Sequence, residues 1–336
     1  MREKPAIPDQ LLQATLQDQY NINPIMLEFL PLGLDYHAGG YRVVSEQGNA
    51  YFLKATSRPL YEPRYTVPRY LNDQGITSVV APLPARSGSL WAKLEHWTVI
   101  VYPFLDGDTS FTGMTTEQWR RLGDIFKQIH QVTIPAACYE SLRKETFDVT
   151  EYIRWIHAFE TQHLQSQYVE STSQQALQAD WQINQDTIHE MVNLLEKLAA
   201  LLQKQSGPYV FCHADLHPAN LIRDTNGNVF VIDWDDVMLA PKERDFIFVR
   251  DTEADAFWEG YGHPQIDWVA LTYYRCERVV QDVVACAEDM FFKHDLGEET
   301  RADIVSLFHE IVQGNTGTIN DIYMAAAHLP PDLSLW

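Results

Sequence analysis

The sequence lacks the features that mark several specialised classes of protein. Its four cysteines form no C-x-x-C pair and have no metal-ligand spacing with histidine: Cys138, Cys212, Cys276 and Cys286. We therefore expect reduced thiols, with neither a disulfide frame nor a zinc site. No stretch approaches the ~18 apolar residues of a membrane helix, and the N-terminus has no apolar signal core. These absences predict a cytoplasmic protein.

Positive charge is also scarce. The 336 residues include 25 Lys and Arg against 46 Asp and Glu, which gives a formal net charge of −21. Such a field repels polyanions and concentrates cations, so neither nucleic acid nor an anionic membrane is an expected partner. An acidic surface that serves only solubility is the alternative, and charge by itself does not choose between the two readings.

The chain is long enough for two lobes, and its pattern changes near residue 103. β-rich runs such as 51–54 and 98–102 predict an antiparallel sheet with one or two helices in the first hundred residues. Helical patterns follow, with a capping box at Thr115 and an apolar stripe over about residues 181–204. We expect an α+β protein with an N-lobe over 1–103 and a mainly helical C-lobe over 104–336.

The strongest motif is His213-Ala-Asp215-Leu-His217-Pro-Ala-Asn220, followed 13 residues after Asn220 by Asp233 in Val-Ile-Asp-Trp-Asp. Phosphoryl transfer needs a carboxylate that accepts the proton of the attacking hydroxyl and oxygen ligands that hold Mg²⁺ against the nucleotide phosphates. Asp215, Asn220 and Asp233 supply that set. The alternatives are loop residues that cap turns, or a metal held by His213 and His217.

This motif resembles the H-x-D-x-x-x-x-N loop and metal-binding Asp of the aminoglycoside phosphotransferases and their relatives, the choline, homoserine and methylthioribose kinases. Further segments look like the spectinomycin phosphotransferase branch, so that the resemblance covers nearly the whole chain: 232–235, 238–245, 259–262 and 273–278. The resemblance implies a protein-kinase-like two-lobed fold that uses ATP and Mg²⁺. It implies that Asp215 is the catalytic base, that Asn220 and Asp233 hold the metal, and that His213 and His217 support the loop.

In the resembling family a strand lysine reaches the nucleotide phosphates, and Lys54 at the end of Tyr51-Phe-Leu-Lys54 matches it. An acidic residue holds such a lysine in place. Glu62 lies at the family's position, although Pro63 and Pro68 interrupt the segment where a helix would begin. Asp73 is the other candidate for this partner.

Two further segments are expected to bind the nucleotide. Gly33, Gly39 and Gly40 precede Lys54 in a loop that would bring backbone amides close to phosphates, although the spacing also fits a hairpin turn. Adenine would bond to the backbone of the linker 101–104, where Tyr102 and Phe104 flank a proline.

A cationic small molecule is the expected substrate. The candidate contacts are carboxylates and aromatic side chains of the C-lobe: Asp106, Asp108, Asp236, Glu259, Tyr261, Tyr274 and Glu277. Each of them also fits an ordinary surface charge or a core aromatic. The segment 242–245 is expected to form an internal ion-pair network instead.

A protein substrate is not expected, because the chain has Ala214 in place of the kinase arginine, Asp-Trp-Asp at the metal site and no Ala-Pro-Glu ending. The predicted function is inactivation of an antibiotic, spectinomycin or a related aminoglycoside, by phosphorylation of a hydroxyl. A metabolic kinase for choline, homoserine, methylthioribose or a sugar amine is the alternative. A silent pseudokinase is a further one, against which the retained Lys54, Asp215, Asn220 and Asp233 argue.

Overall fold

The computed structural model describes residues 4–31, 37–109, 113–164, 171–205, 207–293, 296–313, 318–331 and 333. The chain divides into two compact units. One unit contains residues 1–143, 210–239 and 251–264, and the other contains residues 144–209, 240–250 and 265–336. Each unit is assembled from segments that lie far apart in the sequence.

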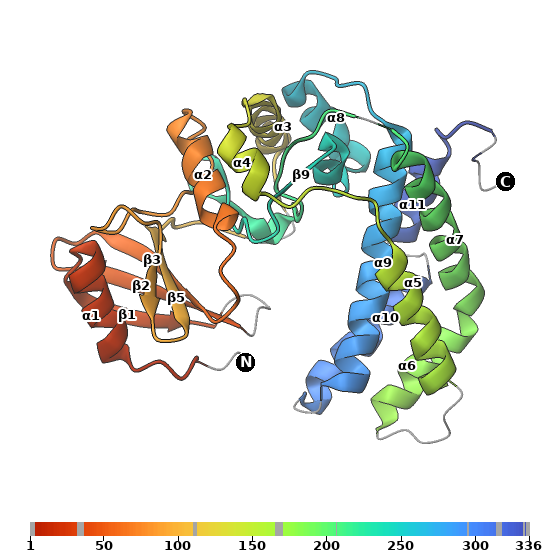
Figure 1. The fold of residues 1–336 in the computed structure, drawn as a ribbon, viewed down its shortest axis with the longest axis horizontal. Coiled ribbons are helices and arrows are strands. Elements are labelled where there is room, and N and C mark those ends of the chain that lie inside the picture. Colours follow the sequence, from red (N-terminus) through yellow and green to blue (C-terminus); the bar gives the residue numbers. More distant parts are fainter. Residues whose placement is uncertain are drawn as a thin grey trace. The chain divides into compact units, whose positions relative to one another are not determined.

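An antiparallel sheet of five strands, in the order β1-β2-β3-β5-β4, dominates the N-terminal part of the first unit (Figure 1). Its strands are β1 (Pro24–Leu30), β2 (Ala38–Ser45), β3 (Ala50–Thr56), β4 (Ala92–Leu94) and β5 (Trp97–Pro103). Gly48 permits the tight turn between β2 and β3, since its φ of 81° lies in the left-handed region. The predicted antiparallel sheet is confirmed.

Helix α1 (Asp9–Tyr20) covers one face of this sheet. Leu12 and Leu16 are fully buried against inward-facing side chains of the central strands, among them Tyr41 and Leu53. Alternation along β2 places every second side chain in this core, as expected of a half-buried strand. The core therefore fixes the register of β3, which carries Lys54.

The rest of the first unit consists of short helices and strands around the H-x-D loop. They are α2 (Pro63–Asp73), α3 (Thr116–Gln131), α4 (Ala136–Ser141), β6 (Val210–Cys212), the 3₁₀ turn η2 (Pro218–Asn220), β7 (Leu221–Arg223), β8 (Val229–Val231), β9 (Met238–Ala240) and α8 (Asp251–Tyr261). The predicted capping box begins α3, because the Thr115 side chain accepts a bond from the Gln118 backbone amide and the Gln118 side-chain oxygen accepts one from the Thr115 backbone amide.

The second unit is helical and is built around the long helix α9 (Figure 1). Its elements are α5 (Thr150–Phe159), the π-helical turn η1 (Glu160–Leu164), α6 (Thr172–Ile183), α7 (Gln185–Leu202), the 3₁₀ turn η3 (Lys242–Phe246), α9 (Trp268–Phe292), α10 (Glu298–Val312) and α11 (Thr318–Ala326). The predicted stripe lies on α7, where Leu195, Leu198 and Leu202 are buried. The single helix predicted over 181–204 is wrong at its start, because α6 extends to Ile183.

Cysteine and membrane predictions can be compared directly with the fold. All four cysteines are free thiols, three of them buried, as expected. Among the described residues, no helix is both long and apolar enough to cross a membrane. The lobe boundary at residue 103 stays a prediction.

Candidate active site

The H-x-D loop begins where the short buried strand β6 ends. His213 is fully buried and its Nε2–H donates to the carbonyl oxygen of Ile232 at 2.8 Å, while its Nδ1 accepts from the Asp215 amide at 3.3 Å. These two bonds define a neutral tautomer with the proton on Nε2. The edge of the imidazole also packs on Trp234, with 4.9 Å between ring centroids. His213 thus links the loop to the chain after β8.

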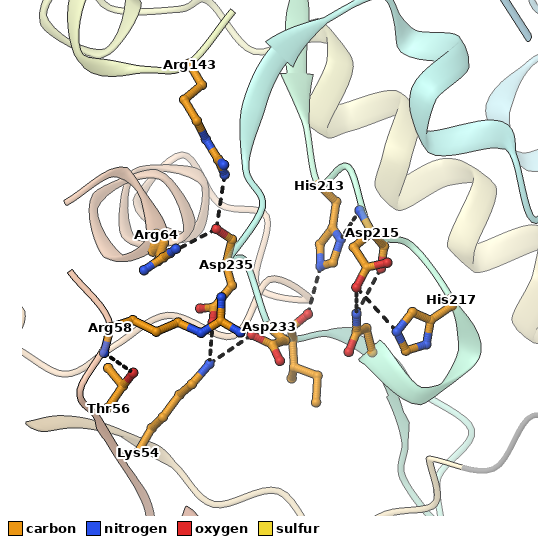
Figure 2. A network of polar contacts seen from close by, with 12 residues as sticks. Lys54, Thr56, Arg58, Arg64, Arg143, His213, Asp215, His217, Asp233 and Asp235 are labelled. Carbon is orange, nitrogen blue, oxygen red and sulfur yellow. Dashed lines mark hydrogen bonds and ion pairs between the residues drawn. The ribbon is translucent and has the colours of Figure 1, made fainter. Parts of the chain in front are cut away.

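The His217 side chain lies beside Asp215 (Figure 2), and the Asn220 side chain is bonded to the same aspartate. Asn220 Nδ2 donates to the Asp215 carbonyl oxygen at 2.8 Å and lies 3.3 Å from its Oδ2. His217 Nε2 lies 3.4 Å from the same Oδ2. Pro218 opens the turn η2 that holds Asn220, a position where its missing N–H costs nothing. The loop holds the Asp215 carboxylate at two points.

Asp233 follows β8 and sits in the left-handed region, with a φ of 59°. Such a conformation costs about 1–3 kcal/mol for a residue other than glycine and persists where surrounding contacts impose it. Here Lys54 Nζ lies 3.0 Å from Asp233 Oδ1 and 3.0 Å from Asp235 Oδ2 (Figure 2). The structure therefore joins β3 of the sheet to the D-x-D segment that follows β8.

The charges of this group influence one another. Burial would lower the pKa of Lys54, but Asp233 and Asp235 raise it above its ordinary value. Burial would raise the pKa of Asp233, yet the nearby Lys54 ammonium keeps it below its usual range. Burial raises the pKa of Asp235 in spite of Lys54, and Asp233 adds to this effect. The Lys54 ammonium therefore favours the ionised form of Asp233, while burial opposes ionisation of Asp235.

The donor set fits a magnesium ion. Asn220 uses its amide nitrogen toward Asp215, which leaves its amide oxygen for a cation. Asp233 uses Oδ1 toward Lys54, which leaves Oδ2. Amide and carboxylate oxygens are the hard ligands that Mg²⁺ takes, usually together with water and nucleotide phosphates.

Lys54 is held by a different carboxylate from the one predicted. Glu62 is exposed at the N-terminus of α2 and makes no contact with Lys54, and Asp73 pairs with Arg69 at 2.6 Å. Asp235 takes this place. Sequence reasoning missed Asp235 as the lysine partner, although the D-x-D spacing places a second carboxylate only two residues after Asp233.

The predicted phosphate loop is only partly described. Gly33 lies outside the described residues. Gly39 and Gly40 lie in strand β2 and not in a loop, which corrects that part of the prediction. A Cβ at Gly39 would come within 2.5 Å of Pro5 Cγ, and one at Gly40 within 2.8 Å of Phe52 Cε2. Both glycines make room for neighbouring side chains, and their contact with phosphate stays a prediction.

The predicted adenine linker is the end of strand β5. Tyr102 pairs with Phe52 across the sheet. The Phe104 amide donates to the Ala50 carbonyl at 3.2 Å, and the Arg42 guanidinium lies 5.0 Å from the Phe104 ring centroid. Because Pro103 has no N–H and the Phe104 amide is engaged, neither of these amides is left for the base.

The predicted substrate contacts of the first unit are of two kinds. Exposed carboxylates with basic partners form the first: Asp108 pairs with Arg223, Glu259 with Arg120 at 2.9 Å, and Asp236 with Arg143 at 3.5 Å. Asp106 is exposed as well. Tyr261 is buried instead, and its hydroxyl lies 2.9 Å from His130 Nδ1. The structure therefore does not support substrate contact by Tyr261, because its hydroxyl is hydrogen-bonded inside the protein.

Tyr274 and Glu277 lie inside the helical unit, which corrects their assignment to a substrate surface. Glu277 accepts from Arg244 Nη1 at 2.8 Å and from the Tyr273 hydroxyl at 3.0 Å. Tyr274 is buried, with its ring 5.2 Å from the Arg244 guanidinium. The predicted internal ion-pair network over 242–245 is confirmed for Arg244 and for Lys242, which pairs with its neighbour Glu243 at 2.6 Å.

Comparison with known proteins agrees with this geometry. The profile of the phosphotransferase enzyme family matches residues 28–276. The structure of spectinomycin phosphotransferase in complex with ADP and spectinomycin has a TM-score of 0.87 and 28% identity, covering 96% of this chain and 99% of that one. Its AMP-bound complex has a TM-score of 0.81 at 28% identity, with the same coverage. No curated protein sequence gives a significant match.

More distant structures share the fold. Amicoumacin kinase, in complex with AMP-PNP, Ca²⁺ and its ligand, has a TM-score of 0.60 at 16% identity, covering 92% of this chain and 94% of that one. The predicted kinase-like fold, with an N-terminal antiparallel sheet and a helical C-terminal part, is therefore confirmed.

Proposed function

Because the chain belongs to the phosphotransferase enzyme family, we propose that it transfers the γ-phosphoryl group of ATP to a hydroxyl of a small cationic compound. Nucleotide-dependent transfer to a small molecule follows from the family and from the structural likeness to a phosphotransferase bound to ADP. The roles of individual residues and the identity of the acceptor are the parts that we propose.

Asp215 is the proposed catalytic base. Its carboxylate is held by Asn220 Nδ2 and by His217, both near Oδ2, and its backbone is held by His213. A fixed carboxylate can orient an acceptor hydroxyl toward the γ-phosphate and take its proton as the new P–O bond forms. Ala214 adopts a φ of 69°, so the loop holds an unfavourable backbone conformation immediately before the base.

Asn220 and Asp233 are the proposed ligands of Mg²⁺. When bound, the metal would neutralise phosphate charge and hold the β- and γ-phosphates in position. Lys54 is the proposed direct phosphate ligand, because its ammonium stays charged and already lies beside Asp233. Together with Asp215, these three residues place a cation, two oxygen donors and the base in a single compact unit.

The proposed acceptor is spectinomycin or a related aminoglycoside, which the reaction would inactivate. Two observations support it: the likeness to spectinomycin phosphotransferase over nearly the whole of both chains, and the net charge of −21, which favours a cationic substrate. The single observation that carries phosphotransfer itself is the Lys54–Asp233 contact beside Asp215 and Asn220.

The acceptor can be found by measuring ADP release from the purified protein with Mg²⁺-ATP. The panel contains spectinomycin, other aminoglycosides, choline, homoserine and methylthioribose. Turnover confined to spectinomycin would support antibiotic inactivation, and turnover on a metabolite would replace it with a metabolic kinase. ATP binding without turnover on any compound would support the pseudokinase alternative.

Replacement of the base tests the mechanism. Asp215→Ala should lower kcat by roughly 10²–10⁴-fold, the range for a lost general base, and leave ATP affinity nearly unchanged. Steady-state kinetics and calorimetry measure the two quantities. Asp18→Ala, at an exposed position of α1, is the matched control. An unchanged kcat in Asp215→Ala would exclude this residue as the base.

A further inference from the structure

The backbone after Asp233 is anchored by three side chains that no motif identifies: Tyr61, Arg64 and Arg143. Arg64 Nε donates to the Asp235 carbonyl oxygen at 2.9 Å, and Arg143 Nη2 donates to the same oxygen at 3.3 Å (Figure 2). The Tyr61 hydroxyl donates to the Val237 carbonyl at 3.1 Å. All of these contacts lie within the first compact unit.

The two guanidinium groups lie near the same aromatic ring, that of Tyr61. The guanidinium carbon of Arg64 lies 5.5 Å from the Tyr61 ring centroid, and that of Arg143 lies 4.7 Å from it. Attraction of each cation to the ring offsets part of their mutual repulsion. The Tyr61 hydroxyl also accepts a bond from the Arg143 amide at 3.0 Å. Contacts with Tyr61 therefore help to hold both arginine side chains in position.

Helix α2 contributes Arg64 to this group of anchoring side chains, but it does not contribute a carboxylate that holds Lys54. Its N-terminal Glu62 is exposed, its inward position is the buried Tyr65, and Asp73 is paired with Arg69. Lys54 depends on Asp235 instead, at 3.0 Å. Asp233 would divide its two oxygens between Lys54 and a metal, whereas Asp235 has no proposed role besides holding the lysine. Its position is set by its backbone, to which Arg64 is bonded.

We propose that Arg64 is a positioning residue of the phosphotransfer site: it fixes Asp235 through the backbone carbonyl, and Asp235 fixes Lys54. The inference rests on the proposed function of Lys54 in binding ATP. Arg64 is the principal anchor because its bond is the shorter one and its side chain is half-buried, whereas the side chain of Arg143 is 51% exposed. Its Nη1 also donates to the Pro59 carbonyl at 3.3 Å, which fixes the guanidinium plane.

Calorimetric binding of Mg²⁺-ATP in the absence of an acceptor tests this role. Loss of a hydrogen bond from a charged donor predicts that Arg64→Ala weakens ATP binding about tenfold. Arg64→Lys should recover part of that loss, since it restores the charge but not the planar donor. Arg64→Gln keeps most of the side-chain volume and gives the same readout if Arg64→Ala does not fold. Arg121→Ala is the matched control, because Arg121 also donates to a loop carbonyl, that of Gly227 at 3.3 Å.

A double-mutant cycle separates positioning from general support of the fold. If Arg64 acts through Asp235, adding Arg64→Ala to Asp235→Ala should change ATP affinity by less than about twofold. Two independent losses that multiply would overturn the proposal. So would a lowered melting temperature with unchanged ATP affinity in Arg64→Ala. Because no acceptor is present, an error in the proposed substrate would leave these results intact.

Discussion

Lys54 in the first compact unit and Arg244 in the second are each bonded to two carboxylates, and the two clusters differ in how far water reaches those carboxylates. In the first unit Lys54 bonds Asp233 and Asp235, whose side chains are 45% and 25% exposed. In the second unit Arg244 bonds Glu145 and Glu277, whose side chains are 7% and 10% exposed. The charge count is the same, at one positive and two negative.

The buried cluster uses its carboxylate oxygens within the protein. Glu277 accepts from Arg244 and from the Tyr273 hydroxyl. Glu145 accepts from two backbone amides through Oε1 and from Arg244 through Oε2. Because these carboxylate oxygens already accept bonds within the protein, few of their lone pairs remain for a ligand. The bonds also stabilise the packing of η3 against α9. This cluster is structural.

The exposed cluster leaves oxygen atoms for a ligand. Asp233 bonds Lys54 through Oδ1, and its other oxygen is available to a metal. Its left-handed backbone, with a φ of 59°, is imposed by the surrounding contacts. The comparison teaches that one cation with two carboxylates can bind a ligand only where the tertiary structure leaves carboxylate oxygens without a protein partner and accessible to solvent.

Removal of Arg244, whose two carboxylate partners are buried, should have the largest effect on stability. Arg244→Met leaves two buried carboxylates without their cation and should lower the free energy of unfolding by about 3–5 kcal/mol. Chemical denaturation measures this loss. Arg154→Met, at an exposed position of α5, is the control for the same replacement. A loss below about 1 kcal/mol would mean that Arg244 is not needed to balance the buried charge.

Removal of Lys54, whose carboxylate partners are the more exposed ones, should affect function more than stability. Lys54→Met should lower kcat/KM by roughly 10²–10³-fold, the range for one lost electrostatic contact in the transition state. Its unfolding free energy should change by less than about 2 kcal/mol, because water can solvate both carboxylates. Lys93→Met, exposed on β4 of the same sheet, is the control. Equal stability losses in Lys54→Met and Arg244→Met would abolish the distinction between the clusters.

The smallest expected effect is a pH dependence in the buried cluster. Burial raises the pKa of Glu277 in spite of Arg244, so the folded state binds this proton more tightly than the unfolded chain. That contribution to stability is full below the ordinary glutamate pKa of about 4.3 and is lost as pH rises through the folded value. Glu277→Gln stays neutral, so its unfolding free energy should rise relative to that of the unaltered protein as pH increases.

Denaturation of both proteins from acid to neutral pH measures this difference. Glu151→Gln, at an exposed position of α5, should show a flat difference. A Glu277→Gln protein that loses relative stability as pH rises would show that attraction to Arg244 outweighs burial.

Much of the first unit could be predicted locally. The capping box at Thr115 depends on contacts between near neighbours in sequence, and it lies where expected. The tight turn at Gly48 is equally local. Asp215 and Asn220 are five residues apart, and a single turn joins them. Short-range motifs of this kind carry their geometry with them.

Contacts between distant segments were harder to predict. The bond from Arg64 to Asp235 spans 171 residues, and the bond from Lys54 to Asp235 spans 181. Glu62 had the expected position in the sequence, yet the start of α2 leaves it exposed. Tyr274 and Glu277 looked like surface recognition residues because their types also occur in binding sites, whereas the packing around α9 buries them.

The sequence by itself determined the order of sheet and helices and the spacing of the H-x-D loop, because periodicity and turn chemistry act over a few residues. It also determined the family, since the motif and its flanking strands occur together. Only the tertiary structure decided which carboxylate holds Lys54 and which charged cluster is buried. Burial and long-range pairing depend on how distant segments pack, and no local pattern contains that information.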